Sequence, residues 1–202
     1  MINRRDLIKG TAAIIPSAVA LQMLGTKWAF AAGEFSGPVD VLNYALTLEY
    51  LEAEFYRQGN EADLLSGKAK TYLEAIQKDE EAHVVALQDT IKSLGHSPVA
   101  APKVDFGGAF KSKHSYLETA YTFENLGVSA YLGAAPSLLK EKGLLTAAAS
   151  IFGVEARHAA ILGVLGKKQA EGGVYMTAFE KPATRATVLK AASPFLVKAQ
   201  TL

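Results

Sequence analysis

Apolar residues recur at intervals of three and four along four long segments of the chain, which is the spacing of amphipathic helices. In the first segment Leu42, Ala45 and Leu46 follow this spacing. Pro38 stands where a first helical turn tolerates proline, because its missing N–H would have no partner there. The pattern predicts helices over about residues 38–57, 66–94, 114–134 and 144–170, and a shorter one over about 183–192. Glycine or proline follows each of them: Gly59, Gly95, Pro136, Gly172 and Pro194.

Four long helices without a strand pattern predict an all-α fold, a four-helix bundle. The first and second helices, and the third and fourth, are joined by short links, as antiparallel neighbours are. The middle link, about residues 96–113, is long enough to cross the bundle from end to end. We therefore expect a bundle over residues 37–171 with a long crossover between its second and third helices. A C-terminal extension, residues 172–202, contains the short fifth helix.

Two Glu-x-x-His motifs lie on the second and fourth predicted helices, Glu80–His83 and Glu155–His158. Residues three apart share a helix face, so each pair points both side chains the same way. An offset of 75 residues maps the first motif onto the second, and it also maps Glu49 onto Glu124. The same offset relates Ala45, Thr47, Tyr56, Ile76 and Leu87 to identical residues without a gap. The bundle is therefore predicted to consist of two repeated helix pairs.

Charged groups buried together in a bundle core are costly unless something compensates them. Four glutamates and two histidines become reasonable in a core if two divalent cations lie between them. Carboxylate and imidazole ligands suit iron and manganese. The alternative is that these residues are surface charges, but Ile76, Leu87 and their repeat counterparts flank the motifs within apolar stripes. A metal-free bundle remains a further alternative.

The motif set resembles that of the ferritin-like superfamily, over about residues 38–171. The stretch from Leu42 to Glu52, and Ala178–Pro182 with Pro194-Phe195 near the end, resemble bacterial exported ferritin-like and desiccation-related proteins. The resemblance implies two iron or manganese ions. It implies that Glu80 and Glu155 bridge them, that Glu49 and Glu124 are terminal ligands, and that His83 and His158 each cap one metal.

Three further residues lie near the predicted ligands. Tyr56 and Tyr131 follow the terminal glutamates by seven residues on the same face, so they either hydrogen-bond ligand carboxylates or are core aromatics with hydroxyls at the rim. Glu52 lies one turn after Glu49, and its repeat counterpart is Gly127. It is either an extra ligand or general base, or part of a solvated helix face.

The N-terminus has the three regions of an export signal. Arg4-Arg5 precedes two aliphatic residues and Lys9, an apolar run follows, and Ala29-Phe30-Ala31 offers a cleavage site. The paired arginine resembles a bacterial twin-arginine signal, whose export machinery would be a partner. The apolar run is about fifteen residues, shorter than the roughly twenty that span a bilayer. We expect residues 1–31 to be removed, leaving no stable membrane span and a periplasmic or secreted protein.

Charge and cysteine content narrow the possible functions. The net charge of +1 becomes −2 without residues 1–31, so no basic surface for nucleic acid is indicated. The absence of cysteine excludes thiolate metal ligands and disulfides. Two functions remain: a redox centre of ferroxidase, peroxidase or manganese-catalase type, and a non-enzymatic metal-binding bundle in oxidative or desiccation stress. A compact monomer or homodimer fits better than a storage cage.

Overall fold

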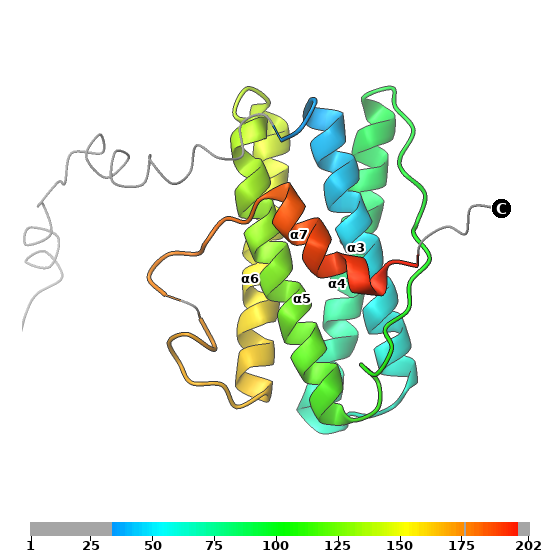
Figure 1. Cartoon of the computed structure of the whole chain (residues 1–202), viewed down its shortest axis with the longest axis vertical. Helices are drawn as coiled ribbons and strands as arrows, with labels where there is room; N and C mark the ends of the chain where they lie inside the picture. Colours follow the sequence, from blue (N-terminus) through cyan, green and yellow to red (C-terminus); the bar gives the residue numbers. More distant parts are fainter. Residues whose placement is uncertain (1–33, 176, 198–202) are drawn as a thin grey trace, which may run out of the picture. The chain divides into compact units, whose positions relative to one another are not determined.

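The apolar stripes of the four long segments meet in an antiparallel helical bundle. The computed structural model describes residues 34–175 and 177–197, so the predicted export segment lies outside the described residues. Helices α3 and α4 pack together as one hairpin, and α5 and α6 as another (Figure 1). Within the described ranges there is no β-strand, and the all-α prediction is confirmed. The long helices are α3 (Pro38–Glu61), α4 (Gly67–Ser93), α5 (Lys113–Ala134) and α6 (Lys142–Leu165).

The link between α4 and α5, residues 94–112, runs along the outside of the bundle from one end to the other (Figure 1). This is the predicted long crossover. It is held by an aromatic cluster: the ring centroids of Phe106 and Phe55 are 5.2 Å apart, and those of Phe55 and Phe123 are 4.9 Å apart. An isolated β-bridge also pairs Val104 of this link with Leu196.

Helix α3 continues beyond the predicted stop at Gly59-Asn60, because tertiary contacts use both residues. A Cβ atom on Gly59 would lie 2.2 Å from the ring of Tyr116, so only glycine allows α3 and α5 to approach here. The Asn60 side chain donates to the carbonyl of Leu73, and its Oδ1 accepts from the Tyr116 hydroxyl at 2.9 Å. These bonds stabilise the last turn of α3.

Helix α6 ends at Leu165, earlier than the predicted position near residue 170. Lys167 has a φ of 55°, a left-handed conformation that ends a helix. The N–H groups of Gly166 and Lys168 donate to the carbonyls of Leu162 and Gly163 and satisfy the last turn. The chain then turns back onto the bundle, where the Tyr121 hydroxyl donates to the Gly173 carbonyl at 2.6 Å.

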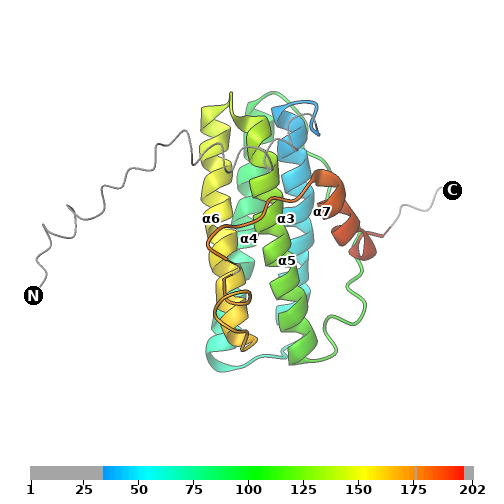
Figure 2. The same cartoon turned by 60° about the vertical axis from the view of Figure 1, so that its left-hand side comes forward.

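The C-terminal segment crosses the bundle and ends in α7 (Arg185–Ala192), which lies obliquely over it (Figures 1 and 2). Arg185 attaches α7 to the start of α3 through Asp40 Oδ2 at 2.8 Å. Val188 is fully buried. Two short 3₁₀ helices complete the described elements, η1 (Ala135–Leu138) between α5 and α6 and η2 (Ser193–Phe195) after α7.

Apolar residues lie on both sides of a polar layer in the bundle. The aromatic cluster around Phe55 is on one side of this layer, and Leu46 and Ile91 are on the other. Glu49 lies between Leu46 and Phe55 on α3. Among the described helices, α6 alone is long and apolar enough to suit a membrane span by composition. In the bundle, its inward side carries the polar layer.

Candidate metal centre

Each long helix places a fully buried glutamate in the polar layer, and these four residues are 0% exposed. The two histidines of the Glu-x-x-His motifs are also buried, since they share a helix face with their glutamates. The glutamates come from four different helices because the repeated helix pairs face each other across the core. The six residues are Glu49 on α3, Glu80 and His83 on α4, Glu124 on α5, and Glu155 and His158 on α6.

These side chains form two overlapping groups of potential ligands. Within each group, one nitrogen or oxygen atom from every residue lies within 4.8 Å of the others, a spacing that suits a bound ion. The two groups share Glu80 and Glu155, which the resemblance implies as the bridging residues; their ligation stays a prediction. One group is Glu49, Glu80, His83 and Glu155, and the other is Glu80, Glu124, Glu155 and His158.

Hydrogen bonds among these groups leave several buried atoms unsatisfied. His158 Nδ1 lies 2.9 Å from Glu80 Oε1, yet neither atom has a hydrogen-bond partner among the described residues. Both carboxylate oxygens of Glu155 are likewise buried without such a partner. Atoms that approach closely without hydrogen-bond geometry are arranged as ligands of a common cation are. The residues present therefore fit a pair of metal ions.

Two tyrosines hold the outer carboxylates by hydrogen bonds that cross between the helix pairs. Tyr131 donates to Glu49 Oε1 at 2.5 Å, and Tyr56 donates to Glu124 Oε1. Both phenols are buried, so their hydroxyls do not lie at the rim of the bundle. Each tyrosine contacts the glutamate of the opposite repeat, which fixes the distance between the two helix pairs at the polar layer.

Glu52 is a fifth carboxylate in the core, not part of a solvated face. It is 4% exposed, and its Oε2 has no hydrogen-bond partner among the described residues. Its space comes from Gly127, where a Cβ atom would lie 3.4 Å from Glu52 Oε1 and 2.9 Å from Glu155 Oε2. The glycine in one repeat therefore makes room for the additional glutamate of the other.

Asp79 is a contact that the sequence analysis did not identify, because it stands in an exposed run of charges. Its Oδ2 lies 3.1 Å from Nε2 of His158, the nitrogen that faces away from the other carboxylates. A carboxylate in this position orients an imidazole and makes its other nitrogen a better ligand. The 75-residue offset maps Asp79 onto Val154, which has no carboxylate, so the two halves of the site differ. Comparing the repeats position by position would have marked Asp79 as a difference next to a motif.

Burial and mutual repulsion keep protons in the site when no metal is bound. Burial, with the charge of Glu155 added, raises the pKa of Glu80 to about 8. Burial and the charges of neighbouring glutamates, Glu155 for Glu52 and Glu124 for Glu155, raise the pKa values of both groups well above the usual range. Burial by itself would lower the histidine pKa values, but the surrounding carboxylates outweigh it and raise the pKa of His83 to about 12 and that of His158 to about 11.

Fold and site together define a helical bundle whose core carries a carboxylate and histidine cluster. The chain belongs to the ferritin-like domain family, which matches residues 37–168. A solved structure of a ferritin-like, diiron-carboxylate protein from Bacillus anthracis str. Ames shares the fold, with a TM-score of 0.55 and 24% identity over 63% of this chain and 94% of that chain. A search of curated proteins found no match.

The contact between Asp79 and His158 predicts that the two metal sites differ in affinity. We expect Asp79→Asn to weaken binding of one metal about tenfold to a hundredfold, because the amide orients the His158 ring less well. Titration with Mn²⁺ followed by calorimetry measures this. Glu81→Gln is the matched control, since Glu81 is an exposed neighbour that accepts a hydrogen bond from Gln77. Equal affinities for Asp79→Asn and the unchanged chain would contradict the role of Asp79.

The raised pKa values predict how the stability of the metal-free chain depends on pH. An unfolded glutamate loses its proton near pH 4.5, whereas folded Glu80 keeps its proton to about pH 8. The folded state therefore binds more protons in this window, and stability falls as pH rises. Above about pH 6.5 the histidines act in the same direction, since their folded pKa values are also raised. We expect the free energy of unfolding in chelator to fall between pH 5 and pH 8, with Glu80 alone contributing on the order of 3 kcal/mol.

Urea denaturation at both pH values measures this drop. Metal ions displace the protons, so added Mn²⁺ should stabilise the chain more at pH 8 than at pH 5. In Glu80→Gln, which removes one titrating carboxyl, the metal-free slope should be smaller. Metal-free stability that rises between pH 5 and pH 8 would show that the carboxyl pKa values are not raised.

Proposed function

We propose that this protein holds two metal ions, iron or manganese, between its helix pairs and reacts there with dioxygen or hydrogen peroxide. The observation that carries the proposal is the set of buried ligand atoms in the polar layer that lack hydrogen-bond partners among the described residues. His83 would cap one ion and His158 the other. Glu80 and Glu155 would lie between them, and Glu49 and Glu124 would hold the outer sides.

Two adjacent metal ions would supply a shared two-electron change with the oxidant. The protein's own residues orient the ligand side chains and exclude water from the site. Tyr56 and Tyr131 hold the outer carboxylates in one orientation, and Asp79 does the same for His158. Glu52, kept protonated by burial and by the charges around it, could give a proton to a reduced oxygen product. Oxygen and imidazole ligands without thiolate suit both iron and manganese, so both metals belong to the proposal.

The burial of the site favours metal ions that stay bound over iron ions that enter and leave, as they do in storage. Because the four central glutamates are 0% exposed, a hydrated cation would have to lose its water shell to pass the apolar clusters. A small neutral oxidant crosses such a layer at a much lower cost. The geometry therefore supports a fixed centre of peroxidase or catalase type better than iron storage. The same burial also favours the second candidate, a non-enzymatic bundle stabilised by its metals under oxidative or desiccation stress.

Metal content tests the ligand assignment directly. We expect the full chain, loaded with Fe²⁺ without oxygen or with Mn²⁺, to hold two ions by elemental analysis. His83→Ala and His158→Ala should each lose about one ion, because each removes the capping ligand of one site. His96→Ala is the matched control, since His96 is exposed and far along the chain from both motifs.

Fewer than about half an ion per chain after loading would contradict both metal-binding functions. With two ions bound, addition of dioxygen or hydrogen peroxide separates the candidates. Repeated consumption of oxidant, with a visible spectral change in the iron form, supports the redox centre. Two tightly bound ions without turnover support the non-enzymatic bundle.

We further propose that the protein is exported through a twin-arginine pathway to the periplasm or the exterior of a bacterium. Support comes from Arg4-Arg5, the short apolar run and Ala29-Phe30-Ala31. Export in the folded state would let the bundle take up its metals in the cytoplasm. Metal uptake before export suits a buried centre, because the ions can bind while the bundle folds. A role in oxidative or desiccation stress outside the cytoplasm is the function we propose for the exported protein.

The export proposal predicts a processed protein outside the cytoplasm. Mass spectrometry of fractionated bacteria should find a chain shortened by about 31 residues in the periplasm or medium. Changing both arginines to lysine (Arg4→Lys, Arg5→Lys) should leave the full-length chain in the cytoplasm, because twin-arginine machinery reads that pair. Lys9→Arg, which keeps the charge, is the control. Normal processing of the double variant would contradict this route.

A further inference from the structure

Of the six predicted metal ligands, only the two histidines reach the surface of the described bundle. The exposed fraction of the side chain is 11% for His83 and 7% for His158, whereas the four glutamates are 0% exposed. The two rings come from α4 and α6, and their centroids are 6.4 Å apart. The boundary between α4 and α6 is therefore the place where the predicted metal centre comes nearest to solvent.

Asp79 continues this boundary to the outside of the bundle. Its side chain is 54% exposed, and its Oδ2 lies 3.1 Å from Nε2 of His158. The other ring nitrogen of His158, Nδ1, lies 2.9 Å from Oε1 of the buried Glu80. Groups that can bind a cation thus follow one another from solvent to the core: an exposed carboxylate, an imidazole and a buried carboxylate.

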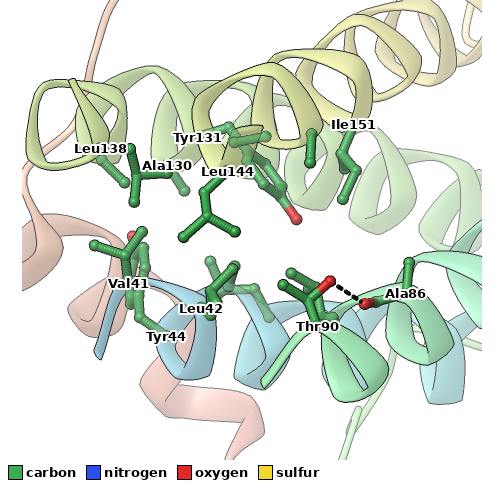
Figure 3. A pocket seen from close by; sticks show the side chains of 16 residues that line it. Val41, Leu42, Tyr44, Ala86, Thr90, Ala130, Tyr131, Leu138, Leu144 and Ile151 are labelled. Carbon is green, nitrogen blue, oxygen red and sulfur yellow. Dashed lines mark hydrogen bonds between the residues drawn. The ribbon is translucent and has the colours of Figure 1, made fainter. Parts of the chain in front are cut away.

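The two ends of the bundle offer a hydrated cation no comparable series of groups. At one end, aromatic rings around Phe55 fill the core. At the other end, Figure 3 shows Val41 and Leu42 of α3 facing Leu144 across an apolar cavity, and none of the residues that line it is charged. A cation entering at either end would lose its water without finding an opposite charge.

The boundary between α3 and α5 is closely packed at the level of the site. Tyr56 is fully buried there and donates to Glu124. A Cβ atom on Gly127 would lie 2.9 Å from Glu155 Oε2, which shows how closely the backbone of α5 approaches the carboxylates. The remaining boundaries, α3 with α4 and α5 with α6, lie within the two tightly packed hairpins.

We propose that metal ions enter and leave the folded bundle between α4 and α6, with Asp79 as the first contact and His83 and His158 as the inner boundary of the route. This inference rests on the proposed pair of metal ions. A cation on this route would exchange water for carboxylate and imidazole in steps, which costs less than losing its whole hydration shell at once. Protons that the imidazoles hold in the metal-free site must leave as the ion binds, and the partly exposed rings let them reach solvent. Because the ion has to displace His158 from Asp79 on its way, exchange is expected to be slow, as suits ions that stay bound.

Val154 on α6 is a position at which this route can be blocked. It is half-buried, lies four residues before His158 on the same helix face, and is the repeat counterpart of Asp79. In Val154→Trp we expect loading of the folded, metal-free chain with Co²⁺, and removal of bound Co²⁺ by EDTA, both to slow about tenfold or more, because the indole fills the passage. The equilibrium affinity for Co²⁺ should stay the same within about threefold, since no ligand is removed. Co²⁺ accepts the same kinds of ligand as iron and manganese, and its visible absorption follows the bound ion.

Ala149→Trp is the matched control for the blocking variant. Ala149 is exposed and lies on α6 nine residues before His158, which is two and a half helical turns, so it is on the opposite face. A negative charge at position 154 should have the opposite effect to the indole. Val154→Asp should speed Co²⁺ loading about threefold to tenfold at low ionic strength, and added salt should reduce this gain. Ala149→Asp adds the same charge to the opposite face and should leave the loading rate unchanged. Val154→Asp also keeps the route testable if Val154→Trp folds poorly by circular dichroism.

Unchanged rates of loading and removal in a folded Val154→Trp chain, or equal loading rates in Val154→Asp and Ala149→Asp, would overturn this route. So would a folded, metal-free chain that takes up Co²⁺ only after it is unfolded and refolded, because the ions would then enter during folding. In each of these cases the loaded chain would still hold two ions, and the metal assignment would stand. A chain that holds no ions after loading and refolding would overturn both proposals.

Discussion

The burial of five carboxylates in the middle of an apolar bundle is the constraint on which the rest of the structure depends. Five glutamates are buried among hydrophobic residues, where isolated negative charges are very costly: Glu49, Glu52, Glu80, Glu124 and Glu155. Protons, imidazoles and tyrosine hydroxyls compensate part of that cost, and buried oxygens without partners among the described residues indicate that cations would compensate the remainder. The helices can meet around this layer because the apolar clusters on both sides stabilise the bundle.

The internal repeat makes the two halves of the site similar, and they differ at a few positions. Tyr56 donates to Glu124 and Tyr131 donates to Glu49, so each hydrogen bond joins one repeat to the other. Glu52 and Asp79 have Gly127 and Val154 as their counterparts, so extra carboxylates occur on one repeat only. The two overlapping groups of potential ligands therefore have different surroundings.

The two ends of the bundle are also unlike. Around Phe55, aromatic rings from α3, α5 and the crossover fill the core. At the other end, small residues such as Ala45 and Ala130 line an apolar cavity together with Tyr131. The side of the polar layer near Phe55 is closed by packed aromatics instead. Small neutral molecules fit this environment better than hydrated ions do.

Periodicity, the 75-residue offset and the two Glu-x-x-His motifs were sufficient to predict the bundle, the crossover and the residues that would meet in its core. These features are local or repeat along the chain, so the sequence alone determines them. Other features depended on residues far apart in the chain. Helix α3 passes Gly59 because Tyr116 packs there, Asp79 reaches His158 from a different helix, and Gly127 makes room for Glu52. Only the tertiary structure decides such contacts, because they depend on how closely two helices approach and on which side chains meet across that distance.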